Sequence, residues 1–199
     1  MKYLIKSLSI LALFLLVQSQ ALADNRKSFS GSVVVEWLNG GDDRKMKLLE
    51  ELSYTDPKGK VWKVPKGAII DGASIPKAFW SFVGPPFVGA YRRASVVHDY
   101  YCDKKSDTWE AVHRMFFDAS LDGGVSVSKA VTMYAAVYAG GPRWKTVKML
   151  GSSPLDEPIK IPLDPILPEE DLEEVMKWTE NKNVSIDDVE KHIKSLANK

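Results

Sequence analysis

Hydrophobic and polar positions change from a strand-like to a helix-like pattern along the chain. The segments 28–38, 46–55 and 60–64 are rich in residues that favour strands, such as Val33, Trp37 and Trp62. Turn sequences, Asn-Gly-Gly-Asp and Asp-Pro-Lys-Gly, separate one segment from the next. The N-terminal part is therefore expected to form a small antiparallel sheet.

Apolar positions in the middle of the chain recur with helical spacing. They predict three helices over 89–103, 106–121 and 126–139, and Ser106 is the expected N-cap of the second. A proline at its first position makes 76–82 a candidate for a short helical turn. These helices are expected to pack with the sheet.

Prolines recur every three or four residues over 151–168, which predicts an extended, stiff connector. Two short helices are expected beyond it, one over 169–179 and one that begins at Ser185. The spacing of Ser185 and Asp188 resembles a capping box. The C-terminal tail is either an incidental appendage or a docking arm for a partner protein.

Together these patterns predict an α+β fold. A small N-terminal antiparallel sheet packs with a three-helix unit, and a Pro-rich connector and a short helical tail follow. The expected organisation is a signal peptide at 1–23, a globular domain with a His-Asp helix at 24–150, a linker at 151–168 and a helical tail at 169–199.

The N-terminal residues have the pattern of a secretory signal. Lys2 and Lys6 precede an apolar run, Leu8–Val17, and Ala21-Leu22-Ala23 offers a cleavage site before Asp24. The run is about half the length needed to span a bilayer. We therefore expect an exported protein, periplasmic or secreted, that is not an integral membrane protein once the signal is cleaved.

Composition and charge exclude several classes of protein. The 199 residues are 45% hydrophobic and carry a formal net charge of +1, which becomes −1 when the two signal lysines are removed. Such a balance does not call for a nucleic-acid partner. The single cysteine, Cys102, excludes an internal disulfide framework.

The residues that could carry chemistry lie on the first two predicted helices. His98 and Asp99 are adjacent on the first, and His113 lies on the second. If the link between the helices turns the chain back, His98 and His113 face each other, and Cys102 shares the helix face of His98. Such a buried polar pair must be satisfied by mutual hydrogen bonding, water or a metal. His98 and His113 are therefore the candidate catalytic residues.

A second candidate feature is the acidic turn that begins at Asp71 and continues with Gly72, Ala73 and Ser74. A carboxylate beside Gly and Ser commonly binds its own backbone in an Asx-turn. The alternative is a role for Asp71 in binding a metal or a substrate. Turn chemistry and ligand binding use the same residues here, so both interpretations stay open.

Several of these residues together resemble an uncharacterised family of bacterial and phage proteins, whose signature is Asp-Gly-Ala-Ser-x-Pro followed by a His-Asp helix. The resemblance covers roughly residues 29–144 and implies no activity, but it is compatible with a phage-derived origin. The residues that carry it are Asp71-Gly72-Ala73-Ser74-Ile75-Pro76, Trp80, Gly84-Pro85, Gly89, Tyr91, His98-Asp99-Tyr100 and Phe116.

The same segment is more loosely similar to secreted microbial phospholipases A2. That similarity implies a calcium-dependent ester hydrolase acting on phospholipid, with His98 as the base and Asp99 and Asp71 as metal ligands. The sequence departs from those enzymes because His113 stands where they have an aspartate that orients the base, and Cys102 where they have a tyrosine. Their disulfides are also absent.

A third interpretation is a zinc site formed by His98, Cys102 and His113 with Asp99, since imidazole and thiolate suit zinc. Their spacing matches no known zinc signature, so calcium is the favoured metal, and the cofactor is not determined. The leading function is a cell-envelope binding or accessory protein, whose partner is an envelope protein or phospholipid. The alternatives are the hydrolase and a structural protein in which the His-Asp pair only ties helices together.

Overall fold

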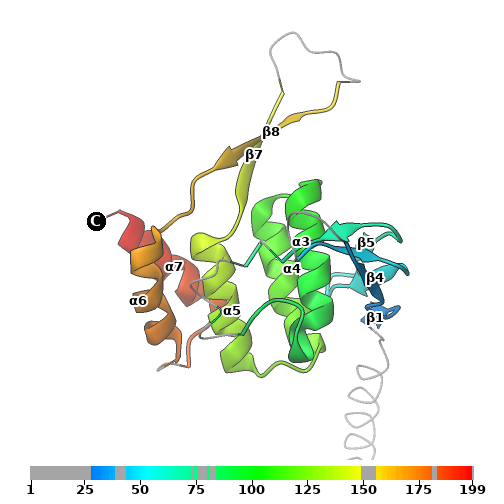
Figure 1. Ribbon diagram of the computed structural model, residues 1–199. Coiled ribbons are helices and arrows are strands. Elements are labelled where there is room, and N and C mark those ends of the chain that lie inside the picture. Colours follow the sequence, from blue (N-terminus) through cyan, green and yellow to red (C-terminus); the bar gives the residue numbers. More distant parts are fainter. Residues whose placement is uncertain are drawn as a thin grey trace, which may run out of the picture.

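The computed structural model (Figure 1) describes residues 28–38, 44–72, 74–75, 80, 84–148, 156–180 and 183–198. The signal peptide expected at 1–23 and the turn expected at 39–42 lie outside the described residues. Apart from Trp80, the helical turn expected at 76–82 lies outside them as well.

Two small antiparallel sheets form the N-terminal part. One has the strand order β1-β4-β5 and the other β2-β3-β6. The strands are β1 (Phe29–Ser30), β2 (Val35–Trp37), β3 (Met46–Leu48), β4 (Leu52–Thr55), β5 (Val61–Val64) and β6 (Ile69–Ile70). The expected antiparallel sheet is present, but the strands expected over 28–38 and 46–55 are each broken in two, and β6 was not anticipated.

The two breaks lie side by side. Gly31 separates β1 from β2 and has a φ of +90°, and a Cβ built on it would lie 2.3 Å from the carbonyl oxygen of Glu51, in the segment that separates β3 from β4. Only glycine tolerates both the backbone angle and the close approach. The segment that contains β1 and β2 and the segment that contains β3 and β4 therefore both pass from one sheet into the other at this point.

The three central helices follow the prediction closely. They are α3 (Arg92–Lys104), which continues the short 3₁₀ helix η2 (Gly89–Tyr91), then α4 (Trp109–Asp122) and α5 (Val127–Gly140). The expected N-cap of α4 was wrong. Thr108 is the cap, and its side chain accepts a hydrogen bond from the Ala111 amide. The Ser106 hydroxyl donates to the Asp107 carboxylate instead.

The Pro-rich region contains a strand that the sequence interpretation did not foresee. β8 (Ile159–Leu163) pairs antiparallel with β7 (Arg143–Val147), and the two strands project from the helices as an arm (Figure 1). We call residues 143–148 and 156–163 the β7–β8 arm. The indole nitrogen of Trp144 donates to the Asp107 carbonyl at 2.8 Å, which attaches the base of the arm to the α3–α4 link.

The last two helices, α6 (Glu169–Glu180) and α7 (Ile186–Ala197), pack against α5. The expected capping box of Ser185 and Asp188 is confirmed at the start of α7. Most apolar side chains of both helices are buried, and the Tyr134 hydroxyl of α5 donates to Glu190 of α7 at 2.7 Å. The tail helices therefore share a core with α5, while the expected domain boundaries stay a prediction.

The elements follow one another across the molecule in the order sheets, α3, α4, α5, and then α6 with α7 (Figure 1). This arrangement confirms the α+β class and places the α3–α4 contact at the centre of the core. Within the described ranges, no helix is long and apolar enough to cross a membrane.

Candidate functional site

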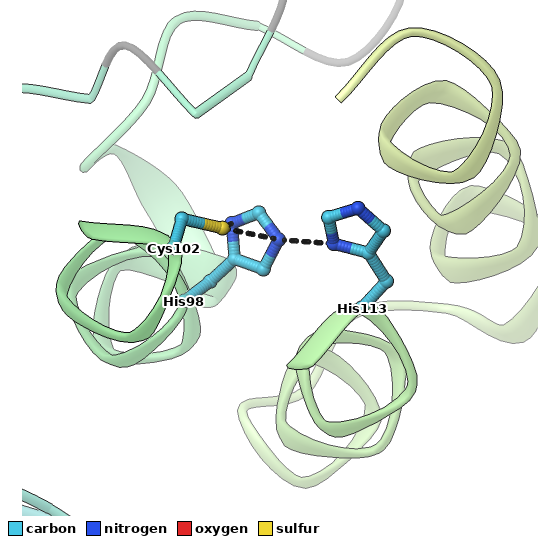
Figure 2. A group of neighbouring side chains, drawn as sticks. All are labelled: His98, Cys102 and His113. Carbon is cyan, nitrogen blue, oxygen red and sulfur yellow. Dashed lines mark hydrogen bonds between the residues drawn. The ribbon is translucent and has the colours of Figure 1, made fainter. Parts of the chain in front are cut away.

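The contact between α3 and α4 brings the two predicted histidines together. Nε2 of His98 lies 2.8 Å from Nδ1 of His113, and neither side chain is exposed to solvent (Figure 2). One nitrogen donates and the other accepts. The link between the helices folds the chain back as expected, and helical geometry then aligns the two positions.

Aromatic rings enclose the histidine pair. The His98 ring packs against Phe116 with ring centroids 4.6 Å apart, and the His113 ring packs edge-on against Trp109 at 5.5 Å. Trp109, His113 and Phe116 follow the helical spacing of four and three residues, so they share one face of α4. Aromatic side chains therefore cover this side of the pair.

Burial sets the charge state of the pair. It lowers the pKa of His98 from 6.5 to about 3, and it lowers the pKa of His113 well below 6.5, with the neighbouring His98 adding to the effect. Both rings are therefore neutral at neutral pH. The outer nitrogen of His113, Nε2, is buried without a hydrogen-bond partner among the described residues, although the Pro142 carbonyl nearby favours its protonated form.

Cys102 completes the group on the α3 side. Its Sγ lies 3.6 Å from Nε2 and 3.9 Å from Nδ1 of His98, one helical turn away (Figure 2). Burial raises the pKa of the thiol, while a hydrogen bond with the Ser74 side chain acts against this shift. In the part of the chain that the structure describes, His98, Cys102 and His113 are the one group of three such donors, with ligand atoms within 4.8 Å of one another.

Asp99 has a different role from its neighbour on α3. One carboxylate oxygen accepts the backbone N–H groups of Asp71 at 2.8 Å and Gly72 at 3.0 Å, and the other accepts the Ser74 N–H at 3.3 Å. Asp99 is itself buried. Its negative charge is stabilised by these backbone donors, so it anchors the acidic turn to α3.

The sequence interpretation did not identify this contact. It considered Asp71 as the acceptor for its own turn, whereas Asp99 accepts from that turn across 28 residues of sequence. The negative charges of Asp99 and Asp71 both raise the pKa of Asp103, after the larger effect of burial. The two carboxylates are thus near each other, but in the described ranges they join no group of three donors close enough to share an ion.

Other residues of the predicted signature build the loop beside this turn. The Trp80 indole donates to the Ile75 carbonyl at 3.2 Å, and the Tyr91 hydroxyl donates to the Pro85 carbonyl at 2.8 Å. Gly72 has a φ of +71°, and a Cβ built on it would lie 2.5 Å from Cγ of Pro86. Among the described residues, these contacts therefore join Trp80 to Ile75 and Tyr91 to Pro85, and Gly72 lies close to Pro86.

The fold and site define a class: an α+β protein in which a His–His–Cys cluster lies between two helices and an aspartate on the first helix anchors a turn. Residues 46–137 match the family model described as a protein of unknown function (DUF1353). The match runs from β3 into α5 and includes the whole cluster. The expected resemblance to a family without assigned activity is confirmed at this level.

Two curated relatives come from the bacterium Sinorhizobium fredii. The uncharacterised protein y4jT is 43% identical over 117 residues, which cover 59% of this chain and 35% of that protein. The uncharacterised protein y4iH is 41% identical over 120 residues, which cover 60% of this chain and 50% of that protein. The chain thus spans half or less of the length of these relatives. No solved structure matches it significantly.

Proposed function

We propose that this protein is an exported accessory protein of the bacterial cell envelope that acts by binding a partner rather than by catalysis. The observation that carries this proposal is that His98 and Asp99, the base and the metal ligand that a hydrolase would need, already bind other groups of the protein. His98 is bonded to His113, and both oxygens of Asp99 accept backbone N–H groups. The His-Asp pair then serves the fold, as a junction between two helices and a turn.

The hydrolase alternative has weaker support in this geometry. A general base must reach a water molecule, but His98 has no exposed surface, and burial holds its pKa near 3. His113 in place of a carboxylate cannot stabilise an imidazolium in the way that an aspartate does. A phospholipase with His98 as base and calcium on Asp71 and Asp99 would need this site to open.

The β7–β8 arm is the surface that best fits a binding role. It projects from the helices, and in the described part of the chain its two strands pair only with each other (Figure 1). Ile159 and Ile161 on β8 are 47% and 38% exposed. A groove of about 660 Å³ lies at the base of the arm, lined by Gly140, residues 164–169 and Leu172. We assign an envelope protein as the partner, because exposed apolar residues and free strand edges suit protein contacts.

Export is tested separately from binding. The full chain is expressed in a Gram-negative host, and its compartment and N-terminal residue are determined. The proposal expects a periplasmic or secreted product that begins at Asp24. A product that keeps residues 1–23 in the cytoplasm would contradict it.

Binding is tested with a photo-reactive amino acid at Ile161, and with the same group at Val127 as a matched control. Val127 is 61% exposed on α5, so both positions are accessible. We expect a discrete cross-link to one envelope protein from position 161, lost when Ile159→Lys is added, and none from position 127. Equal cross-linking from both positions would contradict a role of the arm.

Catalysis is tested by fatty-acid release from mixed phospholipid micelles, with calcium and with chelator. The proposal expects no release above background in either condition. Calcium-dependent release that disappears in His98→Ala, while a His192→Ala control retains it, would overturn the proposal and establish the hydrolase alternative.

A further inference from the structure

The His–His–Cys cluster combines three donors that suit a borderline-soft metal ion. Two imidazole nitrogens and one sulfur converge from α3 and α4, with all ligand atoms within 4.8 Å of one another (Figure 2). We propose that His98, Cys102 and His113 form a zinc-binding site that joins α3 to α4. The inference goes beyond the proposed binding function and does not depend on it.

The distances are close to those of a tetrahedral zinc centre. Zinc binds nitrogen at about 2.0–2.1 Å and sulfur at about 2.3 Å, so two nitrogen ligands lie about 3.3 Å apart and a nitrogen and a sulfur about 3.6 Å apart. The separation of Cys102 Sγ and His98 Nε2 is already 3.6 Å. The separation of the two imidazole nitrogens is 2.8 Å, because they share a hydrogen bond. A bound ion needs this nitrogen pair to open by about 0.5 Å. It also needs the sulfur of Cys102 and the His113 nitrogen, in a group whose ligand atoms are up to 4.8 Å apart, to lie about 3.6 Å apart.

The protons of the site can be accounted for. In the metal-free protein, Nε2 of His98 and Nδ1 of His113 share one proton between two facing lone pairs. When an ion takes both lone pairs, each ring keeps its single proton on its outer nitrogen. For His113 that atom is Nε2, which is buried without a hydrogen-bond partner in the described residues and lies near the Pro142 carbonyl. A carbonyl is the usual partner for the outer nitrogen of a metal-bound histidine.

The charges also balance. The Cys102 thiol releases its proton to solvent when the Zn–S bond forms, which leaves one positive charge on the ion and its ligands. The Asp99 carboxylate is next to His98 in sequence, and, after the larger effect of burial, its negative charge raises the pKa of the Cys102 thiol in the metal-free protein. A divalent ion beside the sulfur offsets this repulsion. A divalent ion, one thiolate and one carboxylate therefore give a neutral interior, whereas calcium would lack the oxygen ligands it requires.

The test uses Co²⁺ as a spectroscopic substitute for Zn²⁺ in the purified, chelator-treated chain. We expect one cobalt ion per chain, the near-ultraviolet charge-transfer band of a cobalt–thiolate bond, and loss of that band when Zn²⁺ is added. Cys102 is the only cysteine in the sequence, so the band assigns the ligand without any variant. Absence of the band at saturating cobalt would overturn the proposal.

Variants then test the ligand set. Cys102→Ser should remove the charge-transfer band, and His113→Ala should weaken zinc affinity by about 100-fold or more, given that even residues outside the ligand shell contribute 10–100-fold. His192→Ala is the matched control, because it removes the third histidine of the chain from α7 and should leave affinity and spectrum unchanged. Equal affinity in His113→Ala and His192→Ala would contradict the site. If a ligand variant fails to fold, the spectrum of the unaltered chain decides.

Discussion

At the scale of single residues, adjacent positions on α3 have different tasks. His98 faces α4, whereas Asp99 binds the backbone of the acidic turn. Consecutive helix positions are rotated by about 100°, so neighbours in sequence meet different elements. The two residues of the His-Asp dipeptide thus make separate contacts: His98 with α4, and Asp99 with the acidic turn.

Asp99→Asn is predicted to lower the free energy of unfolding by about 2–4 kcal/mol. The amide either turns its NH₂ group toward the N–H donors of Asp71 and Gly72 or faces Ser74 with it, and the stabilising charge is lost in both cases. Urea unfolding followed by circular dichroism measures the change. Asp103→Asn is the matched control, since Asp103 lies one turn along α3 and its residue surface is mostly exposed, although its carboxylate is partly desolvated. It should change stability by less than about 0.5 kcal/mol. Equal effects of the two variants would contradict the anchoring role.

The histidine pair predicts a loss of stability in mild acid for the metal-free chain. Burial keeps both rings neutral when folded, with the pKa of His98 lowered from 6.5 to about 3. The unfolded chain therefore binds more protons below about pH 6.5, so this stability is present above that pH and is lost as the pH falls toward 3. With chelator present, the free energy of unfolding should be about 2–3 kcal/mol lower at about pH 5.5 than at about pH 7, as measured by urea unfolding at the two pH values.

A double variant isolates this effect. Replacing His98 and His113 together by leucine removes both titrating groups and leaves no unpaired partner. The difference in the free energy of unfolding between the two pH values should then nearly disappear. The same difference in the double variant as in the parent chain would assign the acid sensitivity to other groups.

Residue spacing predicted the His98–His113 contact because both positions lie on helices joined by a short link, where local geometry decides which residues face each other. The contact of Asp99 with the turn at Asp71 could not be predicted in this way. It depends on how the loop before α3 packs, and no local period relates two segments 28 residues apart.

At the scale of elements, the loop that Asp99 anchors depends on Gly72. Its φ of +71° suits glycine, and an added Cβ would lie 2.5 Å from Cγ of Pro86 and 2.9 Å from the Phe87 ring. Gly67 has a similar φ of +89°, but nothing lies within 4 Å of its Cβ position. Alanine substitutions at these two glycines therefore distinguish the cost of backbone strain, which both share, from the cost of a steric clash, which only Gly72 has.

Gly67→Ala is predicted to lower stability by about 1–2 kcal/mol, from strain alone. Gly72→Ala should lower the free energy of unfolding by about 1–3 kcal/mol more than Gly67→Ala does, since the ring of Pro86 cannot move aside as a flexible side chain would. Thermal or urea unfolding of both variants measures the difference. Equal losses would show that the loop yields to the extra methyl group.

Helices were easier to predict than strands, for a physical reason. The apolar stripes of α3, α4 and α5 repeat over several turns, so single exceptions do not hide the period. The strands have two to five residues. The breaks at Gly31 and Glu51 depend on a contact between two segments that are 20 residues apart in the sequence. The N-cap of α4 was misplaced because serine is intrinsically the better cap of the two candidates, Ser106 and Thr108, and only the chain path selects Thr108.

At the scale of the whole molecule, the C-terminal helices complete the core. Leu172, Val175 and Met176 of α6 and Val189 and Ile193 of α7 have at most 3% of their surface exposed. The family match ends at residue 137, so these helices lie outside it. They nevertheless cover α5, which is inside it.

A chain that ends at Lys148 is predicted not to fold stably. Each of the five apolar side chains of α6 and α7 contributes about 1.5–3 kcal/mol when buried, and their sum is similar to the whole stability of a typical domain, about 5–15 kcal/mol. Loss of cooperative urea unfolding and binding of an apolar dye would show this. Ile161→Lys in the arm is the control and should leave the unfolding midpoint unchanged, since Ile161 is exposed. A truncated chain with an unchanged midpoint would restore the view of the tail as an appendage.

The sequence by itself determined the features that depend on local order: the α+β class, the three central helices, the capping box of α7 and the juxtaposition of His98 with His113. Tertiary structure alone decided the contacts between distant segments. These are the division of the strands between two sheets, the Asp99 anchor, the pairing of β8 with β7 and the burial of the tail helices against α5. The reason is that a helical period is repeated within one segment, whereas these contacts depend on which surfaces the folded chain brings together.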